Sequence, residues 1–574
     1  MVEGLRLGVD FGTSATKIAL KLPRKAPVAL PIGEDQTTPY MPSVVTYPVS
    51  QPLAPLVGEE ALRSAALGTS VRSIKRCLGC SEGPCDARRC AALPWCDGSG
   101  SIRLGPGDAV SPEAAVRAII LEAIRRAREA AWRLFRVRLD DLEGVGMGCG
   151  ACFDHDQRAA LVAIVHEAFG AHVPITVIDE PIATAVAYGN LSGIGPGRVL
   201  ICDYGGGTFD AALLDIEDAR PARFTLLAAD GVQWLGGDDI DLMVYERFLS
   251  ALAQGLQVPV TELSDAMASS DRQMLRSQSL QAKESLSSQD RFETTVFSEN
   301  LGIMPLDLAR DDLEGMLRKE RRFESCTFVD RSLHCVRRTI TVAEVFRRAR
   351  HTGLLANDTI ASIRLDAMGS CVEGVVMVGG VTRMPLVRKA LKESFGADKL
   401  ISQQVLDPIC AVAIGAAYAP PADHYSILHP PYSIRLEFRH KDGRCLEDTV
   451  LHAAGDKLDY LGRWPSNSLP VFTTPRKIVS RTYSIGYLVF EVGGVKIAEH
   501  RLRALDKTEH YATIDLAGRV CVDGAVTRRH DAIVPLLHRW QRDIASAERA
   551  RAEDEEEARL RAVRGRDHTL YTEN

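Results

Sequence analysis

The chain has 574 residues, of which 46% are hydrophobic and 25% are charged. This composition excludes a disordered or collagen-like chain, and the length predicts roughly three or four domain-sized units. The net charge of −6, from 69 basic and 75 acidic residues, gives no overall positive field. We therefore expect no nucleic acid and no membrane among its partners.

The N-terminal sequence MVEGLRLGVDFG lacks the basic and apolar regions of a secretory signal, and no apolar run is long enough to span a membrane. We therefore expect a cytoplasmic protein. Because cytoplasmic thiols stay reduced, the 14 cysteines are expected to be buried apolar residues, metal ligands or redox sensors rather than disulfides.

The order of predicted elements divides the chain into four parts. In residues 1–419, short apolar runs typical of strands alternate with longer helical stretches such as 114–135, which predicts α/β layers. Residues 420–431 are rich in proline and predict an extended linker. Polar and apolar residues then alternate with a period of two over 432–530, which predicts a β-rich domain, and 531–574 predict a helical, charged tail. The predicted strands include 5–11, 43–48, 198–204 and 374–380 in the first part, and 433–440, 481–492, 494–502 and 511–522 in the β-rich domain.

Two segments, at residues 5–20 and 198–216, share one pattern: an apolar strand, an aspartate, a glycine turn and a second strand. Glycines in such turns let backbone N–H groups approach a phosphate, and nearby hydroxyls add donors. Aspartates at the strand ends are suited to hold Mg²⁺ through its water shell. A single Asp-Gly turn is common in hairpins, whereas two copies after apolar strands indicate a clamp for one nucleotide. The hydroxyl donors are Thr13, Ser14 and Thr208, and the magnesium-binding carboxylates are Asp10 and Asp203.

Five of the cysteines fall within 20 consecutive residues. Their spacing, C-x2-C-x4-C-x4-C-x5-C, could wrap any four thiolates around a structural Zn²⁺ ion and leave one spare. An iron–sulfur cluster, a redox-responsive thiol group and unliganded thiols are the open alternatives. The five are Cys77, Cys80, Cys85, Cys90 and Cys96, in an insert at about residues 77–96.

Eight motifs follow one another along the chain: GVDFGTS at 8–14, SIKRCLG at 73–79, CFDHDQR at 152–158, IDEPIATAVAYG at 178–189, DYGGGTFD at 203–210, LGGDDID at 235–241, VVMVGGVTRMPLVRKAL at 375–391 and DPICAVAIGAA at 407–417. In their spelling and order they resemble the motifs of the seventy-kilodalton heat-shock (DnaK-type) chaperones of the actin-like ATPase superfamily. The resemblance covers roughly residues 4–419 and is that of a divergent member. It implies an α/β fold with a two-lobed actin-like ATPase domain, followed by a small β-rich domain and a C-terminal helix.

The resemblance also implies roles for the residues in these motifs. Lys75 would place a cation near the transferred phosphoryl group, which suits a reaction that depends mostly on positioning and electrostatics. Glu180 and Asp210 would act near the metal and the attacking water. The catalytic residues implied in this way are Lys75, Asp10, Glu180, Asp203, Asp210 and Thr208. The nucleotide-binding residues implied are Gly12, Thr13, Ser14, Gly205, Gly206, Gly207, Gly236, Gly237, Lys283, Ser287, Gly379, Gly380, Arg383 and Asp407.

The sequence departs from the family pattern at several places, two of which affect the expected nucleotide binding and domain coupling. Leu280 stands where the adenine-binding helix of the family has an acid, which weakens the expected adenine contacts. In the linker, only Ile427 and Leu428 correspond to the acidic-leucine pattern that couples the family's domains.

From the motifs we expect a slow ATPase with ATP or ADP and Mg²⁺ as cofactors, and Zn²⁺ if the cysteine insert binds it. Mg-ATP turnover in the cleft would switch the affinity of a chaperone-like protein for a polypeptide client, with a co-chaperone or nucleotide exchange factor as a further partner. The alternative is a nucleotide-gated scaffold, or a redox- or metal-responsive sensor for a dedicated partner, with little or no turnover.

Overall fold

The chain, described by a computed structural model, divides into two compact units. Unit 1 comprises Met1–Val336, Gly369–Tyr425 and Gly462–Pro470, and unit 2 comprises Arg337–Met368, Ser426–Leu461 and Val471–Asn574. The described residues are 4–78, 101–105, 108–140, 142–150, 153, 155–191, 195–218, 223–233, 235–298, 302–319, 328–337, 339–340, 372–401, 406–418, 425–428, 433–440, 442–452, 457–459, 476–479, 485–492, 495–501, 509–514, 520–522 and 525–526.

Unit 1 alternates strands with helices, so the predicted α/β class is confirmed. Its strands are β1 (Leu5–Phe11), β2 (Ala15–Lys21), β3 (Val28–Ala29), β4 (Met41–Pro42), β5 (Val45–Pro48), β6 (Leu56–Val57), β7 (Gly68–Val71), β8 (Ile102–Gly105), β9 (Asp108–Val110), β10 (Leu142–Cys149), β11 (Ile175–Asp179), β12 (Gly197–Tyr204), β13 (Thr208–Glu217), β14 (Arg223–Gln233), β15 (Arg291–Ser298), β16 (Gly302–Ala309) and β17 (Gly374–Val378). Its helices are α1 (Glu59–Arg63), η1 (Ala65–Leu67), η2 (Ile74–Cys77), α3 (Pro112–Phe135), α4 (His155–Phe169), α5 (Glu180–Leu191), α6 (Gly237–Leu256), α7 (Val260–Ala266), α8 (Ser269–Ser285), α9 (Arg310–Lys319), η5 (Gly380–Arg383), α12 (Pro385–Phe395) and α13 (Ala411–Tyr418).

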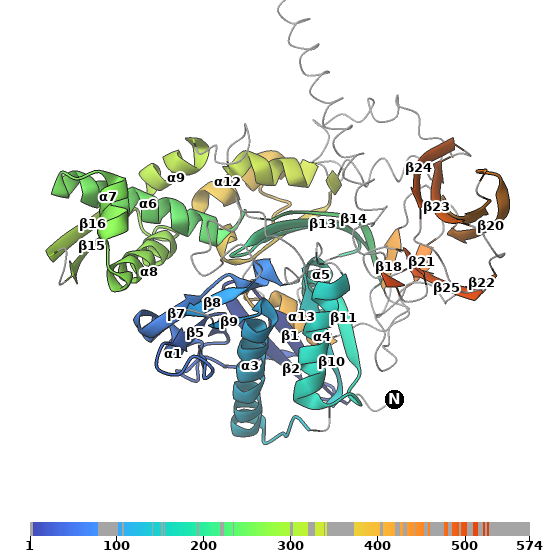
Figure 1. Cartoon of the computed structure of the whole chain (residues 1–574), viewed down its shortest axis with the longest axis horizontal. Helices are drawn as coiled ribbons and strands as arrows, with labels where there is room; N and C mark the ends of the chain where they lie inside the picture. Colours follow the sequence, from blue (N-terminus) through green and yellow to red (C-terminus); the bar gives the residue numbers. More distant parts are fainter. Residues whose placement is uncertain are drawn as a thin grey trace, which may run out of the picture. The chain divides into compact units, whose positions relative to one another are not determined.

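Two mixed sheets of similar construction form the centre of unit 1 (Figure 1). In the first sheet, β1 pairs antiparallel with β2 and parallel with β10, which pairs in turn with β11. In the second sheet, β12 pairs antiparallel with β13 and parallel with β17, and β13 pairs with β14. We call the first sheet with α1, α3, α4 and η2 the first lobe, and the second sheet with α6–α9, η5 and α12 the second lobe. Each lobe thus begins with a strand, a glycine turn and a second strand.

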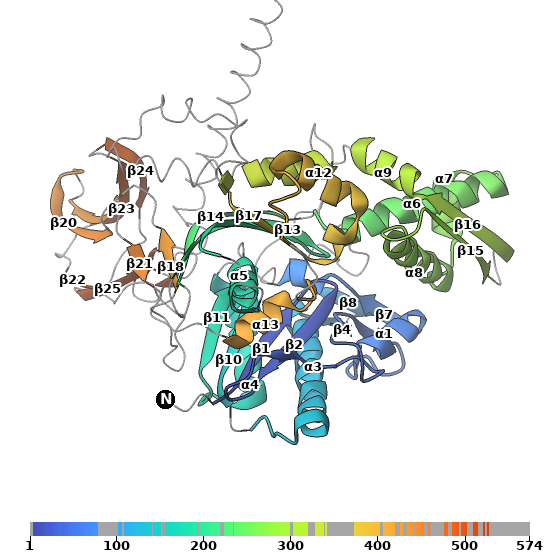
Figure 2. The same ribbon diagram turned by 180° about the vertical axis from the view of Figure 1, so that it is seen from behind.

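Helices α5 and α13 connect the two sheets. Helix α13 contacts β1, β2 and β10, whereas α5 contacts α13, β12 and β13, and Figure 2 shows α13 beside β1 and β2. The packing is close, because a Cβ atom built on Gly8 would lie 2.0 Å from the Ala413 carbonyl oxygen, and one on Gly415 would lie 1.7 Å from that of Ala183. Glycine at these positions therefore lets the helices approach their neighbours, and every residue from Ala411 to Ala417 is buried.

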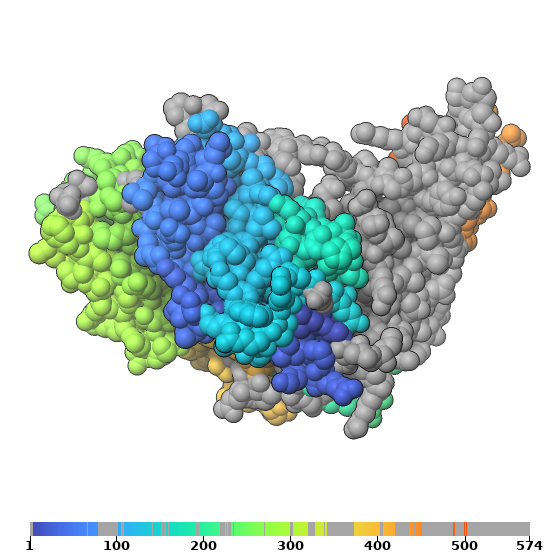
Figure 3. Space-filling model, turned by 90° about the horizontal axis from the view of Figure 1, so that it is seen from below, coloured from blue at the N-terminus to red at the C-terminus, as the bar shows by residue number. Residues whose placement is uncertain are grey.

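Helix α3 forms a support for the first lobe, and it matches the helix predicted over residues 114–135. Ser111 caps it by accepting a hydrogen bond from the Ala114 N–H, and Pro112 occupies its first turn, where the missing N–H costs nothing. Buried residues recur at helical spacing along its inner face, including Ile119, Ala123 and Ala127. In Figure 3, α3 in light blue and the N-terminal strands in dark blue cover one face of unit 1, beside the green elements of the second lobe.

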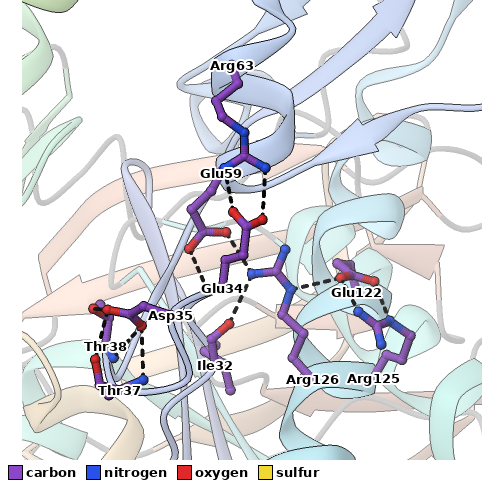
Figure 4. Close-up of polar contacts among 10 residues, drawn as sticks. All are labelled: Ile32, Glu34, Asp35, Thr37, Thr38, Glu59, Arg63, Glu122, Arg125 and Arg126. Carbon is purple, nitrogen blue, oxygen red and sulfur yellow. Dashed lines mark hydrogen bonds and ion pairs between the residues drawn. The ribbon is translucent and has the colours of Figure 1, made fainter.

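Polar contacts fasten α3 to the rest of the first lobe (Figure 4). The Arg126 guanidinium donates hydrogen bonds to Glu59 of α1 at 2.7 Å, to Glu122 at 2.8 Å and to the Ile32 carbonyl at 3.1 Å. These contacts join the segment between β3 and β4, helix α1 and helix α3 around one half-buried cation. A neighbouring surface pair joins Arg63 to Glu34, at 2.5 Å.

Strands make up most of the described residues of unit 2. A four-stranded sheet has the order β20-β19-β23-β24, a second has the order β22-β25-β26-β27, and β18 pairs with β21. Leu436 and Phe438 are buried on one face of β19, as expected from alternation with a period of two, and Val489 of β23 is buried on the other face. Strands β19, β23 and β24 match three of the predicted strands, whereas the single strand predicted at 511–522 is wrong, because β25 and β26 there pair antiparallel. The predicted tail at 531–574 lies outside the described residues. The strands are β18 (Tyr425–Leu428), β19 (Ser433–Arg439), β20 (Cys445–His452), β21 (Lys457–Asp459), β22 (Arg476–Val479), β23 (Ile485–Val492), β24 (Val495–Arg501), β25 (Glu509–Ile514), β26 (Val520–Val522) and β27 (Ala525–Val526).

None of the helices in the described parts of the chain is both long enough and apolar enough to cross a membrane.

Candidate active site

The first glycine turn joins β1 to β2 in the first lobe. The Gly12 N–H donates to the Ala15 carbonyl at 3.1 Å, and a Cβ atom on Gly12 would lie 2.5 Å from that oxygen. Asp10 is buried at the end of β1, where its carboxylate accepts a hydrogen bond from Lys17 Nζ at 3.0 Å. Burial alone would lower the pKa of Lys17, but the charge of Asp10 raises it above its ordinary value. The turn thus presents backbone amides beside a buried ion pair.

The second glycine turn joins β12 to β13 in the second lobe with the same geometry. The Gly205 N–H donates to the Thr208 carbonyl at 3.0 Å. Asp203 and Asp210 face each other in register on the two strands, and Thr208 Oγ1 donates to Asp210 Oδ2 at 2.8 Å. Both sequence-predicted aspartates of this turn therefore lie at one end of the second sheet.

The two turns meet across the lobes. A Cβ atom on Gly206 would lie 1.8 Å from Ser14 Oγ, and one on Gly207 would lie 2.6 Å from Thr13 Oγ1. The start of α6 closes over the second turn, because a Cβ atom on Gly236 would lie 2.3 Å from the Gly206 carbonyl oxygen. Only glycine fits at these contacts, so the two turns lie directly against each other through the backbone of one and the hydroxyls of the other.

Lys75 lies beside the two turns, paired with Glu180. Its Nζ lies 2.5 Å from Glu180 Oε1, and both side chains are buried. Burial alone would lower the pKa of the Lys75 ammonium, but the charges of Glu180 and Asp10 raise it above its ordinary value. Lys75 is therefore held as a cation. It comes from η2 and Glu180 from the first turn of α5, so the pair also joins two elements of unit 1.

Acidic groups outnumber basic ones around this pair. Burial, followed by the charges of Glu180 and Asp210, raises the pKa of Asp203 to about 8. Burial is the main cause of this rise, and the neighbouring carboxylates add to it. A cation bound there would restore the balance, which fits a magnesium ion held through water. The four carboxylates belong to Asp10, Glu180, Asp203 and Asp210, and the two ammonium groups to Lys17 and Lys75.

The expected adenosine residues flank the same turn. Gly379 has φ of 83°, in the left-handed region, and a Cβ atom there would lie 2.3 Å from the Tyr204 carbonyl oxygen. Lys283 of α8 donates to the Gly237 carbonyl at 3.2 Å and pairs with Asp241 at 2.8 Å. At the outer edge, the half-exposed pair Arg383–Asp407 is 3.6 Å apart. Gly380 begins η5, and Ser287 Oγ donates to the Lys283 carbonyl at 3.3 Å.

The cysteine prediction falls mostly outside the described residues. Cys77 is buried at the end of η2, while Cys80, Cys85, Cys90 and Cys96 are outside the described ranges. In the part of the chain that the structure describes, no group of three or more histidine, cysteine or acidic side chains is arranged to ligate a metal ion directly. Zinc, iron–sulfur and thiol interpretations of the insert therefore stay predictions.

Three side chains at the site were missed by sequence reasoning. The Phe153 ring centroid lies 5.4 Å from Lys75 Nζ, a cation–π contact. Arg158 is buried and donates to the Phe153 carbonyl at 3.1 Å and the Gly150 carbonyl at 3.2 Å, which fixes the loop that carries the ring. Arg76 reaches into the second lobe. Phe153 and Arg158 belong to the motif at 152–158, and membership of that motif was the only indication in the sequence that they lie at the site.

Comparison with known proteins agrees with this geometry. The family model described as Hsp70 protein matches residues 6–346 and 359–421. Chaperone protein HscA homologs from Burkholderia mallei (strain SAVP1), Burkholderia pseudomallei (strain K96243) and Burkholderia thailandensis are each 29% identical to the chain over 415 residues. The match covers 72% of this chain and 57% of each relative, so the chain spans little more than half the length of these relatives. The resemblance found in the motifs is thus confirmed, and the chain belongs to the Hsp70 family.

Proposed function

We propose that the chain binds and hydrolyses Mg-ATP between the two lobes and acts as an ATP-dependent chaperone. The observation that carries this proposal is the buried Lys75–Glu180 pair, 2.5 Å apart, beside two facing glycine turns. A positive charge fixed next to a phosphate cradle and surrounded by carboxylates suits phosphoryl transfer to water. Membership of the Hsp70 family supports the same activity.

The two glycine turns and the nearby aspartates would bind the phosphates and the magnesium ion. Backbone amides of Gly12, Thr13 and Ser14 in the first turn, and of Gly205, Gly206 and Gly207 in the second, would bind the triphosphate. Magnesium would supply charge neutralisation for the phosphates when bound. Asp10 and Asp203 would hold its water shell, beside the carboxylates of Glu180 and Asp210.

The remaining residues would orient the reacting groups. Lys75 would hold the attacking water and the transferred phosphoryl group in line, and Glu180 would keep its ammonium in place. Asp210 would accept a proton from the water, since Thr208 already orients its carboxylate. At the other end, Lys283, Ser287, Gly379, Gly380, Arg383 and Asp407 would bind the adenosine, and Gly236 and Gly237 would close the turn over the phosphates.

We further propose that nucleotide state controls the binding of a polypeptide. Residues 1–419 would be the ATPase domain, 420–431 the linker, and 432–530 a reduced substrate-binding domain, because the described strands there form two antiparallel sheets. A co-chaperone or nucleotide exchange factor would act on the lobes. The HscA names of the relatives support a chaperone of this kind.

Steady-state ATP hydrolysis tests the function directly. Wild-type protein and Lys75→Ala are compared with and without an unfolded peptide, and ATP binding is measured in parallel. We expect turnover that the peptide raises and that Lys75→Ala abolishes while binding persists. Tight ATP binding with no Lys75-dependent turnover would contradict hydrolysis and leave the nucleotide-gated scaffold.

The zinc proposal for the cysteine insert has a separate test. Purified protein is analysed for bound metal, and ATP hydrolysis is measured before and after treatment with a chelator. Because Cys77 shares one helical turn with Lys75, we expect metal loss to reduce turnover. Protein without zinc or iron, and with unchanged turnover in chelator, would contradict a metal site.

A further inference from the structure

The 3₁₀-helix η2 carries Lys75 and Arg76, and their neighbouring side chains extend to different parts of unit 1. Lys75 turns toward Glu180 in α5, as described above. Arg76, the next residue, extends to the second lobe, and its side chain is only 5% exposed. A buried guanidinium must have its hydrogen bonds satisfied, so its partners define what this residue does.

The partners of Arg76 lie at two points of the second lobe. Its Nη2 donates to Asp239 Oδ2 at 2.7 Å, and Nη1 donates to Asp239 Oδ1 at 3.3 Å. Nη2 also donates to the Gly207 carbonyl at 2.7 Å. The guanidinium therefore binds one carboxylate with two nitrogens and binds the glycine turn at the same time, which lysine cannot do.

Asp239 belongs to the first turn of α6, and its carboxylate also accepts a hydrogen bond within that turn. Its Oδ2 accepts a hydrogen bond from the Gly236 N–H at 2.8 Å, which caps the helix. The neighbouring Asp238 accepts from Ser73 Oγ and, at 3.4 Å, from Ser14 Oγ, both in the first lobe. The start of α6 thus receives donors from the first glycine turn and from the segment that carries Lys75.

The contact with Gly207 bears on the phosphate cradle itself. Because the peptide unit is planar, holding the Gly207 carbonyl also fixes the direction of the Thr208 N–H in the same unit. Gly207 faces Thr13 of the first turn, and a Cβ atom on it would lie 2.8 Å from Arg76 Nε. Separation of the lobes must break this contact and the Asp239 pair together.

We propose that Arg76 is a positioning residue that latches the two lobes and aligns the second glycine turn in one step. The inference rests on the proposed nucleotide site and adds to it a control over nucleotide release. With Arg76 in place, the cleft closes with the turn already oriented toward the phosphates. Nucleotide leaves when the two lobes part and the guanidinium loses both partners.

The test uses full-length protein and three variants. Arg76→Met keeps the length of the side chain and removes the cation, and Asp239→Asn keeps an oxygen for the helix cap and removes the negative charge. The double variant measures their coupling. Arg125→Met is the matched control, because Arg125 is a 55% exposed arginine that pairs only within α3 among the described contacts.

Two measurements are made on each protein. The first is the dissociation rate of a fluorescent ADP chased with ADP. We expect Arg76→Met and Asp239→Asn each to raise it about tenfold or more, as truncated buried charge pairs do, and the double variant to add little. The second is hydrogen exchange at amides 205–208 without nucleotide, which we expect to speed up in Arg76→Met and not in Arg125→Met.

The outcomes distinguish a failure of the proposed latch from a failure of the proposed nucleotide site. If wild-type protein binds no nucleotide, the proposed function fails, and the exchange measurement still decides the latch. If it binds nucleotide but both single variants release ADP at the wild-type rate, the latch is wrong and the function stands. Additive effects in the double variant would also overturn it. If Arg76→Met fails to fold, Asp239→Asn carries both measurements.

Discussion

The hydroxyl of Ser14 lies directly against the α-carbon of Gly206, although the two residues belong to different lobes. A Cβ atom on Gly206 would lie 1.8 Å from Ser14 Oγ and 3.0 Å from Ser14 Cβ. The closed arrangement of the two glycine turns therefore depends on the absence of one methyl group.

We expect Gly206→Ala to prevent full closure of the turns. Because Ser14 would have to move, the phosphate cradle would be misplaced, and kcat/KM for ATP should fall by about tenfold to a hundredfold. The measurement is steady-state hydrolysis over a range of ATP concentrations. Gly255→Ala in α6 is the control, since a Cβ atom there meets nothing within 4 Å. Equal kcat/KM in the two variants would show that the turns do not close on the nucleotide in this way.

Lys75 and Glu180 should contribute to stability as well as to catalysis. In Lys75→Met, the buried Glu180 carboxylate loses its partner, and unpaired buried charges of this kind cost about 3–5 kcal/mol. We expect a loss of that order in the free energy of unfolding, measured by urea denaturation without nucleotide.

Lys75→Met/Glu180→Gln provides the control for this loss. Removing both charges should recover most of the stability and none of the ATP turnover, because the neutral pair no longer buries a lone charge. A double variant as unstable as Lys75→Met would mean that lost packing, rather than the unpaired carboxylate, causes the effect.

Much of this arrangement could be predicted from sequence, because its signals are local. The glycine turns, Lys75 and Glu180 lie in short motifs, and strands of unit 2 such as β19 and β23 alternate polar and apolar residues with a period of two. Arg76 also lies in a motif, at 73–79, but its contacts with the second lobe could not be predicted in this way. Its partner Asp239 is 163 positions away, and nothing in the surrounding letters distinguishes a buried interlobe arginine from a surface one.

The free energy of unfolding should also depend on pH through the ionisation of Asp241. Burial raises the pKa of Asp241 to about 6, against the attraction of Lys283 and above its ordinary value of 3.8. Since the folded-state pKa is the higher one, this group stabilises the fold below the ordinary value and loses that contribution as the pH rises through 6. Between pH 4 and pH 6, we expect it to lower the free energy of unfolding by about 1–3 kcal/mol.

Urea denaturation of wild-type protein and Asp241→Asn across this pH range measures the effect. The free energy of unfolding of the wild type should fall relative to that of Asp241→Asn as the pH rises, because the variant has no carboxyl group to titrate. In Lys283→Met, the loss of the attracting cation should shift the decline to higher pH. Parallel curves for all three proteins would contradict a raised pKa at Asp241.

Of the arginines in Figure 4, Arg126 should contribute most to the stability of the first lobe. Its side chain is 13% exposed and bonds Glu59, Glu122 and the Ile32 carbonyl, whereas Arg125 is 55% exposed. Truncation of a half-buried cation leaves two carboxylates and a carbonyl without this donor, so Arg126→Met should cost about 1–3 kcal/mol of unfolding free energy. Arg125→Met should cost about 0–1 kcal/mol, as exposed pairs do. Thermal and urea denaturation of the two variants provide the comparison. Equal losses of unfolding free energy would show that burial of the guanidinium does not determine its contribution to stability.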